Sequence, residues 1–401
     1  MKYKGVILFS SLKYLEIGIT ALTTFIVAEE LGPGEMGKSI PIFLFLTYSA
    51  YLTLGINQVM IKNYKKLQSN KEEQDFLIIN LQYHLLAGAI AITLSYILLS
   101  NEYWLFVGFL SAFTILRSYF MTYFRVIDRI HVLNKNNIIF SLLFLIGVLV
   151  FVENLYQYVL IWAISMAIGI ICYFIDAYKM LNTIRKRFLT LNFDLLKKLI
   201  VEGVKLIGIG IITTILLTFD RLILNELDLQ KDILGNYQVA DFFGKAFYMI
   251  ATTVLFYYYP KMIYRLQNEH AYRVIFFKKV ILVNIILVVF PVCSFFFIEL
   301  IQLHFFTNYD LLSHFTLFNV LIKSLVFSSS LFSLIFISVN KEVSYLRNYV
   351  PLLAIVAGAY FYVKFYDIDY RLIGFVLLSV LMLTIFTQYR ACAKIIFKTN
   401  E

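Results

Sequence analysis

Five basic side chains lie inside stretches of this sequence that are otherwise apolar enough to cross a lipid bilayer. A lysine or arginine near the centre of a spanning helix costs about 2.5 to 3.5 kcal/mol on insertion scales. Such groups are therefore expected to face protein or a water-filled cavity and not lipid. A basic cavity would suit an anionic passenger, so the candidate substrate-binding cations are Lys13, Arg117, Lys205, Lys245 and Lys323.

Three of these cations have a carboxylate three or four residues away, which places acid and base on one face of a predicted helix. Each pair can partly neutralise itself. The pairs are Lys13 with Glu16, Lys205 with Glu202, and Lys245 with Asp241.

Arg117 and Lys323 have no acid at helical spacing, so their counter-charge must come from another helix or from a ligand. For any one cation the alternative is an interhelical salt bridge that only fixes packing. Asp220 and Arg221, at the expected outer end of a span, fit an interfacial ion pair as well. The candidate ion-coupling groups, chosen as ionisable residues within or beside spans, are Glu16, Glu202, Asp220 and Asp241.

Catalytic and metal-binding motifs are not found in the sequence. The five histidines include no pair at metal-ligand spacing, and the three cysteines form no CxxC motif, so no metal site is predicted. His84 is expected to be a hydrogen-bonding core residue, with a proton relay as the alternative. We find no GxSxG, HExxH, Walker or Rossmann pattern. We therefore expect no enzyme and no cofactor, and a transport cycle driven by H⁺, by Na⁺ or by the substrate's own gradient.

The composition indicates a multi-pass integral membrane protein. Of the 401 residues, 61% are hydrophobic and only 15% are charged, and the mean hydropathy is +0.79. Such a chain cannot cover a soluble globular surface. Spans and short connections nearly use up its length, which leaves no room for a soluble catalytic domain.

The apolar runs predict an all-α fold. A helical crossing needs about 20 apolar residues, and on that scale the sequence holds about twelve spans. They are placed at 5-28, 39-61, 76-99, 104-124, 138-152, 159-178, 199-219, 237-258, 279-301, 312-339, 349-366 and 372-391.

Basic residues between the spans predict the orientation. With both termini inside, 25 of the 35 lysines and arginines fall in cytoplasmic segments, 5 fall outside and 5 are embedded. This bias favours an N-in, C-in topology. The net charge of +10 is then mostly a topological signal, which argues against nucleic-acid binding and for contact with anionic membrane lipids.

A long polar stretch at 179-198 divides the chain into two halves, 1-198 and 199-401, with six predicted spans each. The two halves look related. Their first spans contain the runs Lys13-Tyr-Leu-Glu-Ile-Gly and Lys205-Leu-Ile-Gly-Ile-Gly, and each span is followed by a polar segment that carries Leu-Gly. Parallel repeats of this kind place a substrate at the interface between the halves.

Two motifs at corresponding places carry a family resemblance. The run Glu30–Gly37, followed by an apolar helix ending Leu54-Gly55-Ile56, resembles the start of polysaccharide-type flippases of the multidrug/oligosaccharidyl-lipid/polysaccharide (MOP) exporter superfamily. In the second half, Phe219–Leu224 and then Leu234–Ala240 resemble the counterpart. The resemblance covers the whole chain, with a longer segment at 225-233 as its departure from the pattern.

The resemblance implies two six-helix bundles around a V-shaped central cavity. It also implies a flippase of the bacterial cytoplasmic (inner) membrane. The cargo would be an undecaprenyl-pyrophosphate-linked oligosaccharide for O-antigen, capsule or exopolysaccharide synthesis, handed on to polysaccharide polymerase machinery. Cavity cations would offset the cost of moving pyrophosphate. Two alternatives remain. A multidrug-type ion-coupled antiporter would favour embedded acids, and a membrane glycan polymerase or acyltransferase would need a sizeable outer loop.

Overall fold

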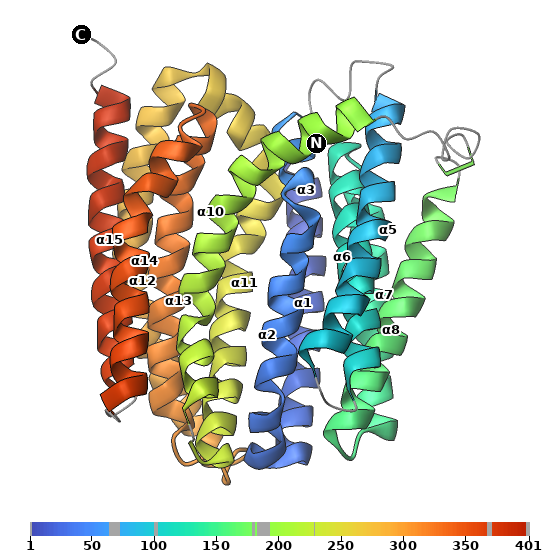
Figure 1. The fold of residues 1–401 in the computed structure, drawn as a ribbon, viewed down its shortest axis with the longest axis vertical. Coiled ribbons are helices and arrows are strands. Elements are labelled where there is room, and N and C mark those ends of the chain that lie inside the picture. The colour runs from blue at the N-terminus through green and yellow to red at the C-terminus, as the bar shows by residue number, and fades with distance from the viewer. Residues whose placement is uncertain are drawn as a thin grey trace. The chain divides into compact units, whose positions relative to one another are not determined.

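The computed structural model describes residues 2–63, 73–99, 103–178, 181–182, 193–227, 229–366 and 371–397. Most of the predicted polar connection at 179-198, with Arg185, Lys186 and Arg187, lies outside these residues. Every regular element described is a helix, which confirms the predicted all-α membrane fold (Figure 1).

The first half of the chain contributes α1 (Lys2–Lys38), α2 (Ile40–Ser49), the short 3-10 helix η1 (Ala50–Thr53), α3 (Ile56–Lys62), α5 (Glu73–Leu98), α6 (Trp104–Val126), α7 (Ile130–Phe151) and α8 (Leu155–Asp176). The second half contributes α10 (Phe193–Glu226), α11 (Lys231–Asn268), α12 (His270–Gln302), α13 (Leu312–Ser338), α14 (Glu342–Tyr366) and α15 (Arg371–Phe397).

The chain forms two compact units. Unit 1 comprises Met1–Leu31 and Pro41–Ile207, and unit 2 comprises Gly32–Ile40 and Gly208–Glu401. The chain passes between the units inside α10, the helix in which the predicted boundary between 198 and 199 also falls. The tip between the first two spans, Gly32–Ile40, belongs to unit 2 although it comes from the first half. The predicted duplication of the halves stays a prediction.

The predicted number of twelve spans is not confirmed. Within the described ranges, eight helices are long and apolar enough to cross a membrane, or up to ten if each bent pair counts as one span. One bent pair joins α2 and η1 to α3 across Leu54 and Gly55, with a bend of 57°. The other is α10, which bends by 42° between Gly208 and Gly210. Only Leu353–Tyr366 of α14 forms an apolar stretch, and it is short.

Leu234-Gly235, which the sequence analysis places in a polar segment, lies within α11. In the first half, α1 is broken at Gly32 (φ 68°, ψ 173°), and helical geometry resumes at Pro33, a residue suited to a first helical turn. Pro351 lies in the interior of α14, because that helix begins at Glu342.

Glycine allows two backbone segments to touch in unit 1. Gly55 has a positive φ of 75°, and a Cβ built there would lie 2.8 Å from the carbonyl carbon of Gly203. A Cβ at Gly203 would in turn lie 3.0 Å from the carbonyl carbon of Gly55. Backbone atoms cannot move aside as a flexible side chain can. The start of α3 therefore packs on α10 only because both residues lack a side chain.

We expect Gly55→Ala to destabilise the protein by about 2 kcal/mol or more, because alanine would meet both the backbone clash and a strained φ. Thermal unfolding of the detergent-solubilised protein measures the effect. Gly358→Ala is the matched control, since no heavy atom lies within 4 Å of a Cβ at Gly358. Equal unfolding temperatures for the two variants would contradict the close contact.

Candidate functional site

The embedded charges of unit 1 gather around one carboxylate, Glu16 on α1. Glu16 Oε2 lies 2.7 Å from Lys13 Nζ, one turn away on the same helix, and Oε1 lies 3.4 Å from Arg117 Nη2 on α6. Glu16 is buried, whereas the side chains of Lys13 and Arg117 are each 18% exposed. This confirms that Lys13 and Glu16 share a helical face, and it supplies the interhelical partner that Arg117 required.

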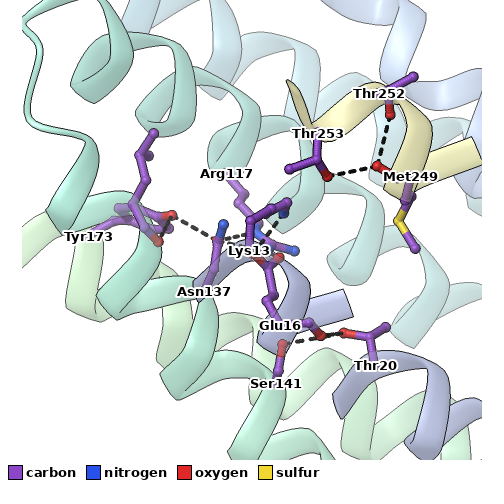
Figure 2. Close-up of polar contacts among 11 residues, drawn as sticks. Lys13, Glu16, Thr20, Arg117, Asn137, Ser141, Tyr173, Met249, Thr252 and Thr253 are labelled. Carbon is purple, nitrogen blue, oxygen red and sulfur yellow. Dashed lines mark hydrogen bonds and ion pairs between the residues drawn. The ribbon is translucent and has the colours of Figure 1, made fainter. Parts of the chain in front are cut away.

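Neutral groups on α7 and α8 complete this unit 1 cluster (Figure 2). Asn137 Oδ1 accepts hydrogen bonds from Arg117 Nη2 at 2.8 Å and from the Tyr173 hydroxyl at 2.9 Å. The Arg117 guanidinium also lies 4.7 Å from the centre of the Phe140 ring, a cation–π arrangement. The guanidinium is therefore held on several sides. The sequence analysis missed Asn137 and Tyr173, although an asparagine inside an apolar span is a usable signal.

In unit 2 three cations share one carboxylate, Asp241 on α11. Its Oδ2 lies 3.0 Å from Arg221 Nη1 and 3.0 Å from Lys245 Nζ, and its Oδ1 accepts a 2.5 Å hydrogen bond from Lys323 Nζ. Asp241 itself is fully buried. The predicted Asp241–Lys245 pair is thus present. Lys323, which has no acid on its own helix, takes its counter-charge from a neighbouring helix.

Packing of α11 against α13 brings these residues together. Tyr237 contacts Phe315, and Tyr248 contacts Phe327 further along both helices, so α11 and α13 run in the same direction. Gly244 makes room between them, because a Cβ there would lie 2.7 Å from Lys323 Cδ. Lys323 also donates to Asn319 Oδ1 at 2.9 Å, a contact one turn away that the sequence spacing could have indicated.

The interpretation of Asp220 and Arg221 as an interfacial ion pair is wrong, because both residues are buried. Asp220 accepts hydrogen bonds from the Arg221 backbone N–H at 2.9 Å and from the Tyr237 hydroxyl. The Arg221 side chain turns instead to Asp241. A buried guanidinium needs a buried counter-charge, and Asp241 provides it.

Lys205, the fifth predicted cation, is part of neither cluster. Lys205 on α10 is exposed and Glu202 is partly buried. In the part of the chain that the structure describes, no ion pair or hydrogen bond joins them, so the predicted pairing of Glu202 with Lys205 is not found.

The cations differ in how far they are available to a ligand. The side chains of Arg221 and Lys323 are at most 2% exposed, whereas that of Lys245 is 34% exposed. Lys13 and Arg117 lie between these extremes. The Glu16 cluster has two cations for one carboxylate, and Asp241 has three. Each cluster can therefore offer a cation to an anionic group while its carboxylate keeps a partner. No group of three potential metal ligands occurs among the described residues.

We expect Asp241→Asn to cost about 3 to 5 kcal/mol of stability, because it leaves buried cations without a counter-charge. Lys323→Met should cost much less, since Asp241 keeps Arg221 and Lys245 and methionine fills similar space. Thermal unfolding in detergent compares the two, with Asp310→Asn at an exposed position as the control. A Lys323 variant that is less stable than the Asp241 variant would contradict this arrangement.

Comparison with known proteins yields structural likeness without sequence likeness. No family model matches the chain, and no curated protein matches it. Among solved structures, a mutant of the Vibrio cholerae MATE transporter VcmN has a TM-score of 0.63 at 14% identity, covering 98% of this chain and 97% of that chain. An outward-facing multidrug resistance MATE family transporter of the MOP superfamily has a TM-score of 0.60 at 14% identity, covering 98% and 95%. An inward-facing one has a TM-score of 0.61 at 12% identity, covering 98% of both chains.

These likenesses extend over nearly the whole chain, and at such low identity they show the fold. They agree with the helical-bundle fold that the predicted resemblance implies, and the comparisons do not support its polysaccharide branch. The chain is a multi-pass membrane protein with the fold of the MATE transporters of the MOP superfamily.

Proposed function

We propose that this membrane transporter carries an anionic amphiphile, namely a polyprenyl-pyrophosphate-linked oligosaccharide destined for a surface polysaccharide. The observation that supports the proposal is the excess of cations over carboxylates in both buried clusters. A pyrophosphate group meets a high barrier in the hydrocarbon region, and charge-assisted hydrogen bonds from lysine or arginine lower it. In this proposal the bacterial inner membrane is the site of action, with both termini in the cytoplasm.

We propose different roles for the embedded cations according to how far their side chains are exposed. Arg221 and Lys323 are enclosed and engaged with Asp241, so we assign them to holding unit 2 together. Lys13, Arg117 and Lys245 keep part of their side chains exposed, and Lys205 is exposed outright. These four are the proposed contacts to pyrophosphate or to acidic sugars.

A multidrug-type antiporter is the second candidate, and the structural comparisons favour it, because the similar structures are MATE transporters described as multidrug resistance proteins. A positively charged drug would need a carboxylate to bind. Among the four candidate acids, Glu16 and Asp241 each already hold at least two cations, and Asp220 is bonded to the Tyr237 hydroxyl. Glu202 is then the candidate acid left for such a drug, which is why we place the anionic cargo first. The glycan polymerase alternative loses support, since the connections at 227–230 and 303–311 are short.

Lys245→Ala should reduce transport of a fluorescent polyprenyl-pyrophosphate by about tenfold or more, because one charge-assisted hydrogen bond is worth about 1.5 to 3 kcal/mol. Arg117→Ala should act in the same direction. Both changes make a span more apolar, so membrane insertion should be preserved. The assay uses purified protein in liposomes and compares this lipid with ethidium, a cationic drug probe.

Lys279→Ala, at an exposed position on α12, is the control for loss of a positive charge. Wild-type protein that moves ethidium but not the pyrophosphate lipid would replace the first proposal with the multidrug candidate. Wild-type rates for the lipid in the Lys245 and Arg117 variants would remove these cations from the substrate path.

A further inference from the structure

The first part of α10, before its bend, has an outward face that mixes lysines with apolar side chains. Phe193 is 72% exposed, Val201 is 54% exposed and Val204 is 47% exposed. Lys197 and Lys198, which lie between them in the sequence, are exposed as well. At 3.6 residues per turn these five positions fall on one side of the helix, which we call the α10 face.

The opposite side of the same turns packs on protein. Leu199 is buried, and Gly203 meets the backbone at Gly55. Within the part of the chain that the structure describes, no ion pair or hydrogen bond involves the side chain of Lys197 or Lys198. One side of this segment is therefore held on unit 1, and the α10 face is left for another partner.

The α10 face carries an excess of positive charge. Asp194 is the exposed acid beside the two lysines, and it lies in the first turn of α10, where a carboxylate stabilises the start of a helix. The sequence holds no aspartate or glutamate between Asp176 and Asp194. Further along, Glu202 is partly buried. The charge of Lys197 and Lys198 thus calls for an anionic partner from outside this segment.

Neither water nor the hydrocarbon core suits the α10 face by itself. A lysine in the hydrocarbon region is costly, and so is a large apolar side chain exposed to water. The headgroup layer of a membrane suits both, because amino groups can meet lipid phosphates there while phenylalanine and valine side chains reach the upper acyl chains. Helices with this mixture lie in the membrane interface.

The two ends of unit 1 differ in the way that membrane interfaces do. At one end Trp104 packs on Tyr96 and Tyr156 packs on Tyr103, residue types that favour the interface. From Trp104, α6 runs for about 35 Å to its other end, where Arg125 lies in the last turn. Figure 1 shows the first turns of α10, in green, running aslant at this second end, beside the start of α5.

The bend in α10 separates the α10 face from the membrane crossing. After the bend of 42°, Gly210–Glu226 is about 26 Å long at 1.5 Å per residue. This length is close to the hydrocarbon thickness of about 30 Å that a span must cross. The turns before the bend are therefore not needed inside the hydrocarbon region.

We propose that the α10 face binds the headgroups of anionic phospholipids, with Lys197 and Lys198 as the contacts to phosphate. The charge of the face selects an anionic headgroup, and its exposed apolar side chains select a lipid surface over a soluble anion. The proposal does not depend on the cargo of the transporter. Lys205, assigned above to the cargo, follows on the same helix, where the pyrophosphate would arrive at headgroup depth.

Native mass spectrometry of the full-length protein in detergent measures lipid binding. Wild-type protein should bind phosphatidylglycerol about fivefold or more tightly than phosphatidylcholine, which has no net charge. The double variant Lys197→Ala/Lys198→Ala should lower the affinity for phosphatidylglycerol about tenfold or more and leave that for phosphatidylcholine unchanged. Lys278→Ala/Lys279→Ala is the matched control, since it removes another adjacent and exposed pair, from α12.

Fluorescence quenching in liposomes measures the depth of the α10 face. Tryptophan is introduced as Phe193→Trp or Val201→Trp, and its signal is the gain over the wild-type protein. Lipids brominated on the upper acyl chain should quench both, whereas the water-soluble quencher acrylamide should have little effect on either. Asp310→Trp, at an exposed position between α12 and α13, is the control and should respond to acrylamide.

Equal loss of phosphatidylglycerol binding in the two lysine-pair variants would assign the lipid to basic residues in general and overturn the proposal. Tryptophans at 193 and 201 that respond to acrylamide and not to brominated lipid would also overturn it, because the α10 face would then meet water or an acidic protein partner. Protein that moves neither cargo probe would contradict the proposed function alone, since neither of these measurements requires transport.

Discussion

A charge buried in a membrane span must find its counter-charge on a neighbouring helix, and this constraint organises both units. Glu16 binds cations from α1 and α6, and Asp241 binds cations from α10, α11 and α13. An unpaired cation at these depths would cost several kcal/mol. Helices that share a carboxylate are therefore held in register by the cost of separating them. The glycine at 244, which lets Lys323 approach α11, follows from the same requirement.

The excess of cations over carboxylates is the feature on which the proposed function depends. A carboxylate with several partners can release one of them without becoming unpaired itself. The partner that can leave is the more exposed one, which is Lys245 in unit 2. Enclosed Arg221 and Lys323 then keep Asp241 neutralised. Each cluster can hold the fold together and still offer a cation to a passing anion, which a single buried salt bridge could not do.

The broken second span lies beside a close contact between two backbone segments. The break at Leu54 and Gly55 places two positive-φ residues in a spanning segment, and Gly55 touches Gly203. The bend of 57° between η1 and α3 and this backbone contact both depend on the absence of a side chain at Gly55.

Composition and helical spacing by themselves determined that the chain is an all-helical membrane protein, and that Lys13 lies beside Glu16 and Lys245 beside Asp241. The two contacts follow from a spacing of three or four residues, which places side chains on the same face of a helix and can be read from the sequence. The spacing of three residues also suggested that Glu202 pairs with Lys205, and the structure does not show this pair. A spacing of three or four residues allows two side chains of a helix to meet but does not require it.

Only the tertiary structure decided that Arg117 binds Glu16, that Arg221 turns to Asp241, and that Asn57 contacts Ser118. The partners in these contacts are separated by many residues, and no local pattern sets which helices become neighbours. That choice comes from how whole helices pack, where a glycine or a break changes the outcome.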